Sequence, residues 1–281
     1  MGNTMISVVV PAHDEERTIE RCLSALLRDV RPGELEIVVV CNGCSDRTAE
    51  VARRFGPPVQ VIETAVASKI HALNLGDEVA RGFPRFYVDA DVEFTTPDLR
   101  EVTEVLQRGE ALFASPCLEL DLRKRPRWMV RAYYSIWHKL PSVQANLAGS
   151  GVYAVSEVGR QRFGRFPDLI ADDLFVQQQY DPSERRRVQS SRSRMRAPRT
   201  FSALVRRKVR VFAGNEQHAE FLPSSGTTTD WTGWLHVIRE QPSLCVHLPA
   251  FVLASVAAKV LARLQLWRGT ISWGRDETSR A

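Results

Sequence analysis

The sequence is short of lysine, and this shortage decides what kind of positive charge it carries. Only five of its 38 Lys and Arg residues are lysine, so the formal net charge of +5 and the pI of about 9.1 come mostly from arginine. Arginine favours bidentate contact with phosphate groups. Composition therefore excludes little among anionic partners: nucleic acid, an anionic membrane surface and a phosphorylated small molecule all stay open.

Cysteine is also scarce and irregularly placed. The five cysteines form no even, regular framework, which favours a reducing compartment over a disulfide-stapled secreted domain. A secretory signal is missing as well, because the apolar stretch from Ile6 to Val10 is followed at once by Pro11 and by acidic residues. We therefore expect a cytoplasmic protein.

A long uninterrupted hydrophobic segment is lacking too. Residues 247–266 are strongly apolar, but Lys259, Arg263 and Gln265 interrupt them, which disfavours a membrane span. An interfacial amphipathic helix and a helix packed on the rest of the protein remain open. The first alternative predicts peripheral attachment to the inner face of a membrane. Its apolar face would consist of Phe251, Val252, Val256, Val260 and Leu264.

What the sequence does contain is a regular alternation of two patterns in its first half. Short apolar runs at 6–10, 35–41, 59–62 and 86–88 predict strands, and amphipathic stretches at 17–27, 45–55 and 68–79 predict helices. Such alternation implies right-handed crossovers and an α/β fold with a mainly parallel sheet. Polar clusters at 11–15, 42–46 and 89–91 each follow a predicted strand. We expect them to converge at one edge of the sheet.

The second half is less regular. Residues 183–199 are dense in Arg and Ser and predict an exposed loop or an edge strand, and residues 200–212 predict a basic helix.

Asp89-Ala90-Asp91 is the first motif with chemical meaning. Two carboxylates one residue apart, on a loop after a strand, can face one hard cation, and Mg²⁺ and Mn²⁺ both prefer oxygen ligands. A pair of solvated turn aspartates is the alternative.

Asp172-Asp173 is the second motif. Acids at the start of a helix are favourable against its dipole, which could be their whole role. The functional interpretation is a general base that removes the proton of an acceptor hydroxyl.

Two further patterns are ambiguous. The basic segment at 206–215 predicts either a solvated helix face or cations that neutralise a leaving diphosphate. Cys41-Asn-Gly-Cys44 has the spacing of a dithiol redox centre, but Asn-Gly inside the pair and Ser45-Asp46 after it favour a turn before a helix.

Taken in order, these segments resemble glycosyltransferase family 2, which has the GT-A fold. Residues 8–16 (VVVPAHDEE) resemble its first strand and P-x-x-N-E loop, and residues 38–48 (VVVCNGCSDRT) its D-D-G-S-x-D-x-T segment. Residues 68–74 (SKIHALN) resemble its K-x-x-A-L-N helix, and 89–91 its metal motif. Residues 149–151 (GSG) resemble its acceptor-side glycine loop, 172–173 its Glu-Asp pair, and 207–214 part of its Q-x-x-R-W-x-x-G segment. The resemblance spans about residues 6–217.

The resemblance implies a metal-dependent, inverting transfer of a sugar from a nucleotide-sugar to an acceptor hydroxyl, with Mg²⁺ or Mn²⁺. The implied catalytic residues are Asp173, as base, and its neighbour Asp172. The implied nucleotide-sugar residues are Pro11, Ala12, Glu15, Asn42, Asp46, Lys69, Asp89 and Arg210. The implied metal ligands are Asp91 and Asp89, and the implied acceptor-side residues are Gly149, Ser150 and Gly151. The acceptor would be a small molecule, a glycan or a lipid-linked molecule, and no nucleic acid is expected.

Departures from the family pattern carry information. Arg207 and Val211 stand in place of Gln and Trp, which disfavours processive polymer synthesis. Asn42 replaces an acid expected near the nucleobase. If its amide faces the base, one acceptor and two donors suit uracil or thymine better than guanine, so a UDP- or dTDP-sugar is predicted.

The resemblance also predicts a domain plan. A Rossmann-like catalytic domain would occupy 1–217, with a nucleotide-binding half at about 1–91 and an acceptor half at about 92–217. A helical extension, with a role in membrane association, would occupy 218–281. A sugar nucleotidyltransferase is the alternative enzyme, but residues 10–16 lack the glycines of a triphosphate loop. A non-catalytic module for anionic surfaces or nucleic acid leaves the carboxylates unexplained.

Overall fold

The computed structural model describes residues 5–122, 126–221 and 232–268. The chain forms two compact units. The first contains the described residues up to 120 together with 147–168 and 172–195, and the second contains those of 121–146, 169–171 and 196 onward. This division does not follow the predicted boundary at 217, so the domain plan stays a prediction. Residues 222–231 and 269–281 of the expected extension lie outside the described residues.

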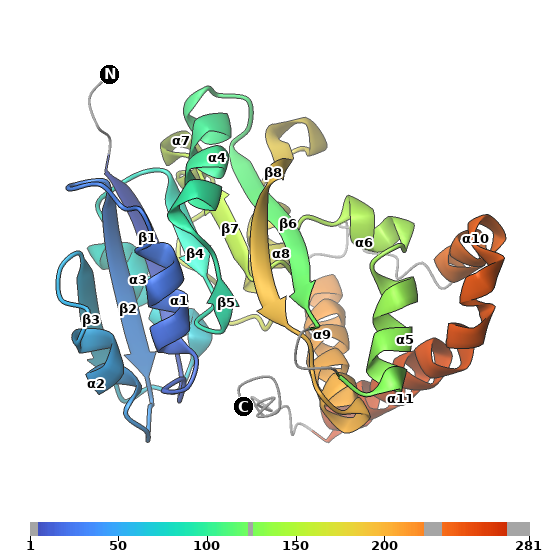
Figure 1. Ribbon diagram of the computed structural model, residues 1–281. Coiled ribbons are helices and arrows are strands. Elements are labelled where there is room, and N and C mark those ends of the chain that lie inside the picture. Colours follow the sequence, from blue (N-terminus) through green and yellow to red (C-terminus); the bar gives the residue numbers. More distant parts are fainter. Residues whose placement is uncertain (1–4, 123–125, 222–231, 269–281) are drawn as a thin grey trace. The chain divides into compact units, whose positions relative to one another are not determined.

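Four parallel strands form the first half of the sheet in the first unit, as the alternation predicts (Figure 1). They are β1 (Ile6–Ala12), β2 (Leu35–Asn42), β3 (Val59–Thr64) and β4 (Arg85–Val88), in the spatial order β3-β2-β1-β4. The helices between them are α1 (Ile19–Leu26), α2 (Thr48–Arg53) and α3 (Lys69–Val79). The carboxyl ends of β1, β2 and β4 are therefore neighbours.

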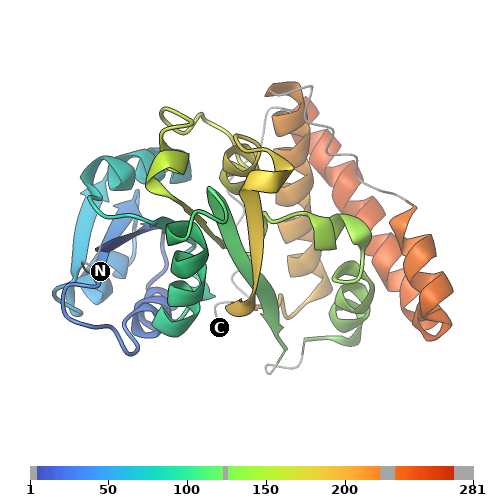
Figure 2. The same ribbon diagram turned by 90° about the horizontal axis from the view of Figure 1, so that it is seen from above.

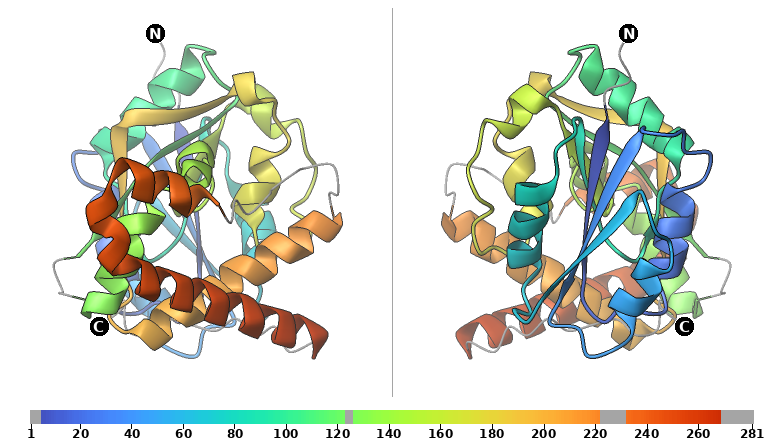
Figure 3. Two further views of the ribbon diagram at one scale, coloured as in Figure 1. Left: turned by 90° about the vertical axis from the view of Figure 1, so that its right-hand side faces the viewer. Right: turned by 90° about the vertical axis from the view of Figure 1, so that its left-hand side faces the viewer.

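Both faces of these strands are covered, which explains their continuous apolar sequences. Val8 and Val10 belong to a core shared with α1, α2 and α4 (Thr96–Gln107). On the other face, Gly76 of α3 approaches Val9 so closely that a Cβ at Gly76 would lie 2.4 Å from the Val9 side chain. The right panel of Figure 3 shows α3 on one side of the strands and α1 and α2 on the other.

The second half of the sheet is antiparallel. Its strands are β5 (Val92–Glu93), β6 (Phe113–Asp121), β7 (Val152–Val155) and β8 (Arg185–Arg196), and the sheet continues from β4 in the order β7-β6-β8-β5. The short helices of the first unit are α7 (Glu157–Arg160), α8 (Asp172–Gln177) and the 3-10 helix η1 (Pro182–Glu184).

The strand β8 decides between the exposed loop and the edge strand expected at 183–199 in favour of a strand. It lies between β6 and β5 in the sheet order, but the two-residue β5 pairs with it only at Arg194 and Met195, so most of β8 lies at an edge of the sheet within the described residues. Ser191, Ser193 and Met195 are buried and alternate with arginines, so the period of two is present but the inward residues are too polar to stand out.

The second unit is helical. Its elements are α5 (Trp128–Trp137), α6 (Pro141–Ala145), α9 (Phe201–Phe221), α10 (Gly233–Glu240), the 3-10 helix η2 (Pro242–His247) and α11 (Leu248–Trp267). Figure 2 shows α9 and α11 side by side, and small residues such as Ala213, Ala258 and Ala262 lie in the core between them. Phe251 stacks on Tyr133 of α5 with ring centroids 5.3 Å apart, so it is buried and does not belong to an outward face.

Candidate active site

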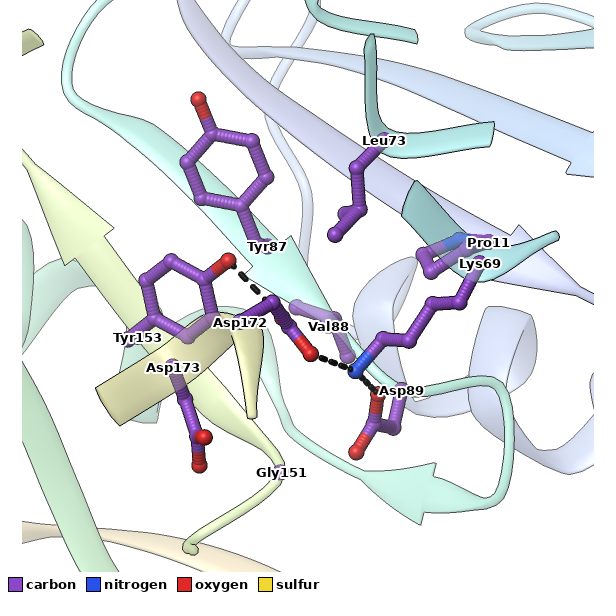
Figure 4. A pocket seen from close by; sticks show the side chains of 10 residues that line it. All are labelled: Pro11, Lys69, Leu73, Tyr87, Val88, Asp89, Gly151, Tyr153, Asp172 and Asp173. Carbon is purple, nitrogen blue, oxygen red and sulfur yellow. Dashed lines mark hydrogen bonds and ion pairs between the residues drawn. The ribbon is translucent and has the colours of Figure 1, made fainter. Parts of the chain in front are cut away.

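A small cavity lies at the carboxyl ends of β1 and β4 in the first unit (Figure 4). It is lined by Pro11, Lys69, Leu73, Tyr87, Val88, Asp89, Gly151, Tyr153, Asp172 and Asp173. Pro11 ends β1 and Asp89 follows β4, and these adjacent parallel strands bring them to the same edge. Six of the residues predicted for the site therefore meet in one place, although they come from segments 160 residues apart.

Lys69 is the cation at the centre of this cavity. Its Nζ lies 2.7 Å from Asp89 Oδ1 and 2.8 Å from Asp172 Oδ1. It begins α3, where the Ser68 side chain accepts a hydrogen bond from the His71 backbone N–H and caps the helix. Burial alone would lower the pKa of Lys69, but Asp172 and Asp89 outweigh it and raise the pKa above its usual range. Lys69 is therefore a fixed positive charge.

Both carboxylate oxygens of Asp172 contact neighbouring side chains. Its Oδ1 pairs with Lys69, and its Oδ2 accepts a hydrogen bond from the Tyr153 hydroxyl at 3.0 Å, as Figure 4 shows. Its side chain is only 3% exposed. Both of its oxygens hold other groups of the cavity in place.

Asp173 differs from Asp172 in its partners. Among the described residues its oxygens accept backbone hydrogen bonds alone, from Gly149 at 2.6 Å and from Leu174 at 2.8 Å. Burial, followed by the negative charge of Asp172, raises the pKa of Asp173 to about 6. It is a carboxylate that can still take a proton near neutral pH.

The Gly149–Gly151 loop supports both carboxylate sites. Gly149 and Gly151 have positive φ angles, of 87° and 69°. A Cβ at Gly151 would lie 2.6 Å from the Val92 side chain, so glycine is needed there sterically. The Gly151 carbonyl accepts a hydrogen bond from the backbone N–H of Asp89 at 2.9 Å. Ser150 is buried, and its backbone carbonyl accepts a hydrogen bond from Ser193.

Asp91 lies outside the cavity lining, in the turn that joins β4 to β5. The negative charge of Asp91 is, after burial, the largest cause that raises the pKa of Cys22 in α1, which places the two side chains near one another. Within the described part of the chain, Asp91 forms no hydrogen bond or ion pair. Asp89 and Asp91 therefore present oxygens at the same turn, and this donor set fits a hard divalent cation.

The loops after β1 and β2 are joined by hydrogen bonds. Glu15 N–H donates to Thr48 Oγ1 at 2.7 Å, and Glu16 N–H donates to Asp46 Oδ2 at 3.1 Å. Asp14 accepts from the backbone N–H of Ser45 at 2.5 Å. Among the predicted nucleotide residues, Ala12, Glu15 and Asp46 thus lie together, and they stabilise the two loops.

Asn42 belongs to the same pair of loops but does not face outward. Its Nδ2 donates to the Ala12 carbonyl at 2.9 Å and to the Val40 carbonyl at 3.5 Å, and its side chain is 2% exposed. A preference for a pyrimidine base requires this amide to donate to the base. In the structure the amide instead donates to two backbone carbonyls.

The two cysteines of this region are free thiols. Cys41 is buried and hydrogen-bonds to Cys44, which lowers the pKa of Cys44 to about 7 and raises that of Cys41. The described residues include one group of three potential metal ligands, His13, Asp14 and Cys44, whose ligand atoms lie within 4.8 Å of one another. The loop after β2 contacts both His13 and Asp14. His13 Nδ1 lies 2.5 Å from the Asn42 carbonyl oxygen, and Asp14 accepts a hydrogen bond from the Ser45 backbone N–H.

A supporting network beneath the cavity was not found from the sequence. Tyr153 stacks on Tyr87 with centroids 4.9 Å apart, and Tyr87 donates to Asp77 at 2.6 Å. Arg85 pairs with Asp77 at 2.8 Å, and Arg160 does so at 2.5 Å. In the sequence, Asp77 appears only as an acid within a predicted helix, and this position does not indicate its partners.

Arg210 lies on α9 in the second unit, whereas the cavity belongs to the first unit. Its predicted contact with a diphosphate remains a prediction.

A family model described as glycosyl transferase family 2 matches residues 7–155. The chain belongs to glycosyltransferase family 2. The resemblance seen in the sequence is thus confirmed, and the protein is a member of an enzyme class.

Curated relatives are similar over part of their length. The uncharacterized glycosyltransferase EpsJ of Bacillus subtilis is 29% identical over 109 residues, which cover 38% of this chain and 31% of EpsJ. The chain spans less than half the length of the first curated relatives it matches.

Solved structures show the same fold. A mannosyltransferase of Pyrobaculum calidifontis, in complex with GDP-Man and Mn²⁺, has a TM-score of 0.62 at 19% identity and covers 99% of this chain and 85% of that one. Glucosyl-3-phosphoglycerate synthase of Mycobacterium tuberculosis, in complex with Mn²⁺, UDP and glucosyl-3-phosphoglycerate, has a TM-score of 0.50 at 20% identity. It covers 68% of this chain and 71% of that one. The predicted GT-A fold, with a mainly parallel sheet flanked by helices, is confirmed.

Proposed function

We propose that this protein transfers a sugar from a nucleotide-sugar to an acceptor hydroxyl with inversion at the anomeric carbon, and that Asp173 is the general base. The observation that carries the proposal is the contrast between two adjacent carboxylates. Asp172 pairs through one oxygen with Lys69 and accepts a hydrogen bond from Tyr153 on the other. Within the part of the chain that the structure describes, Asp173 accepts only backbone hydrogen bonds. Asp173 can therefore accept a proton without breaking an ion pair.

The pKa of Asp173 suits this role. A base works best when its pKa is near the working pH, because it must be deprotonated and still bind a proton well. With a pKa of about 6, Asp173 is mostly ionised at pH 7 and more basic than an ordinary aspartate. The backbone N–H groups of Gly149 and Leu174 hold its oxygens in a fixed orientation.

The reaction can be written with these residues. The acceptor oxygen forms a bond to the anomeric carbon, the bond from that carbon to the phosphate oxygen breaks, and the nucleoside diphosphate leaves with the electron pair. The acceptor proton passes to Asp173. Negative charge grows on the leaving phosphate, and Lys69 supplies a permanent positive charge in the same cavity.

Asp89 and Asp91 are the residues that would hold a divalent cation, Mg²⁺ or Mn²⁺. Asp91 has no partner within the described part of the chain, and Asp89 uses Oδ1 for Lys69. A cation bound there supplies further positive charge beside the diphosphate. The Mn²⁺ and the nucleotides named with the two solved structures of this fold support a donor of this class.

The contacts of Asn42 and the nucleotides of the two solved structures favour no single nucleobase for the donor. One of those structures holds GDP-Man and the other UDP, and Asn42 is engaged with backbone carbonyls. The earlier expectation of UDP- or dTDP-sugar is tested by calorimetric titration of UDP, dTDP and GDP with Mn²⁺ present. Tighter binding of GDP than of either pyrimidine nucleotide would reject it.

Two matched variants test the proposed base. Asp173→Asn should lower sugar transfer by roughly 10²- to 10⁴-fold without weakening nucleotide binding, because only the proton acceptor is lost. Asp172→Asn should weaken nucleotide binding as well, since it frees Lys69 and Tyr153. Loss of nucleotide affinity in Asp173→Asn, with transfer otherwise intact, would instead place Asp173 in the donor pocket.

The metal assignment has its own test. Asp91→Asn should remove most Mn²⁺-stimulated transfer and leave the unfolding temperature near that of the wild type, because Asp91 holds no other described group. Normal turnover in this variant would show that the cation binds elsewhere.

A further inference from the structure

The helix α11 has two faces of different chemistry. Its inner face carries small residues, Ala254, Ala258 and Ala262, which are buried within the second unit. Its outer face carries large apolar side chains that are 41–83% exposed. These are Val252, Leu253, Val256, Val260, Leu264 and Trp267, which are spaced mostly three or four residues apart. The left panel of Figure 3 shows α11 in front, with no other helix of the second unit drawn over it.

The charges that the segment 241–268 itself contributes are of one sign. Residues 241–268 contain no Asp or Glu, whereas Lys259, Arg263 and Arg268 are cationic. Lys259 and Arg263 are one helical turn apart, so they form a row beside the apolar residues. Arg263 is 67% exposed and lies 3.5 Å from Glu216 of α9. An anionic surface would complement this arrangement better than a neutral one.

The segment Pro242–Trp267 is by length and composition also able to cross a membrane. Its packing argues against that role. The inner face of α11 lies against α9, which carries Arg206, Arg207, Arg210, Glu216 and Glu220. A helix that crossed the bilayer in this arrangement would take these charges into the hydrocarbon, which is strongly unfavourable. Contact along the outer face leaves α9 in water.

We propose that the outer face of α11 docks the protein on an anionic lipid bilayer, with the helix axis in the membrane plane. The valines and leucines enter the boundary between headgroups and acyl chains, and Trp267 lies at that boundary at the end of the helix. Lys259 and Arg263 extend their apolar stems along the same face and reach lipid phosphates. This surface is separate from the sugar-transfer proposal and does not depend on it.

Flotation of the full chain with vesicles tests the docking surface. Wild-type protein should float with phosphatidylcholine vesicles that contain phosphatidylglycerol, and much less with phosphatidylcholine alone or at high salt. Val256→Asp combined with Val260→Asp should weaken the partition by about tenfold or more, because two charges enter the apolar stripe. Val158→Asp is the control, since Val158 is 60% exposed on α7 and lies outside α11. It should float like the wild type.

Several outcomes would overturn the proposal. Absence of flotation with phosphatidylglycerol vesicles at low salt is one, and equal flotation of the Val256/Val260 variant is another. A wild-type dimer that this variant converts to a monomer, without lipid binding by either, would show that a second copy of the chain covers the face. Retention on vesicles after a carbonate wash would show a spanning helix. The exposed positions of the variant leave the core intact, and its circular dichroism should match the wild type.

Discussion

Two lysines that are largely shielded from solvent, one in each unit, have opposite electrostatic surroundings: the side chain of Lys69 is 18% exposed, and Lys208 is buried. Lys69 in the first unit is held between Asp89 and Asp172, and its pKa is raised above the usual range. Lys208 in the second unit lies 4.2 Å from the Trp137 ring and 5.3 Å from the Tyr133 ring, and no ion pair joins it to a carboxylate among the described residues. Burial, followed by the charge of Arg207, lowers the pKa of Lys208 to about 7.

The difference shows that burial alone does not decide whether a lysine stays charged. Aromatic rings attract a cation by about 0.5–2 kcal/mol, which is less than the desolvation cost of a buried ammonium. Two carboxylates at hydrogen-bond distance recover that cost. Lys69 consequently remains charged between its two carboxylates, whereas the surroundings of Lys208 disfavour its charged form.

The largest effect is expected when Lys69 is removed. Lys69→Met leaves Asp89 and Asp172 without their cation, so it should lower the free energy of unfolding by about 3 kcal/mol and abolish most transfer activity. Chemical denaturation measures the first effect. Arg53→Met is the control, because its ion pair with Glu63 is more than half exposed and should therefore change the free energy of unfolding far less. Equal, small losses in both variants would remove the distinction between the two kinds of pair.

Lys208→Met should raise the free energy of unfolding at pH 7, which is opposite in sign to the effect of Lys69→Met. The folded pKa of about 7 lies below the ordinary value of 10.5, so between these pH values the unfolded chain binds more protons and stability rises with pH. Methionine should stabilise the protein at pH 7 by about 1–3 kcal/mol and remove this rise. Denaturation midpoints at pH 6.5 and pH 10 report both changes. A destabilised variant with the wild-type pH dependence would mean that Lys208 is held by its aromatic contacts and stays charged.

The smallest effect concerns Cys44, whose charge is stabilised by hydrogen bonds rather than by an ion pair. With a pKa of about 7, Cys44 should react with iodoacetamide at pH 7 roughly tenfold faster than the exposed Cys245. Mass spectrometry of alkylated peptides gives the order. Labelling of Cys245 before Cys44 would contradict the hydrogen-bonded arrangement of the Cys41–Cys44 pair.

The sequence predicts the parallel half of the fold because each strand there is apolar on both faces and separated by an amphipathic helix. It also predicts that Pro11 and Asp89 meet at one edge, since parallel strands end on the same side. The presence of Lys69 and the Asp172-Asp173 pair at the site was implied by the resemblance to the family. For residues 183–199 the sequence left an exposed loop and an edge strand as alternatives, because β8 points serines inward and arginines outward and so resembles a polar segment.

The contact partners of individual side chains could not be predicted from the sequence for a different reason. The orientation of Asn42 depends on the Ala12 carbonyl of another strand, and the role of Tyr153 depends on an acid 19 residues away. Lys208 belongs to a basic stretch that suits a solvated helix face, and only the packing of α5 against α9 buries it. Spacing along one segment contains no information about such contacts.

The pH dependence of transfer tests the central claim, that Asp173 accepts the acceptor proton, most directly. Initial rates of sugar transfer at saturating donor and Mn²⁺ should rise with pH through a midpoint near 6 in the wild-type protein. Asp172→Asn should move that midpoint to lower pH, because the charge of Asp172 no longer raises the pKa of Asp173. Asp173→Asn should show a low rate without this rise. A wild-type rate that is flat between pH 5 and pH 7, or the same rise in Asp173→Asn, would contradict the assignment of Asp173 as the base.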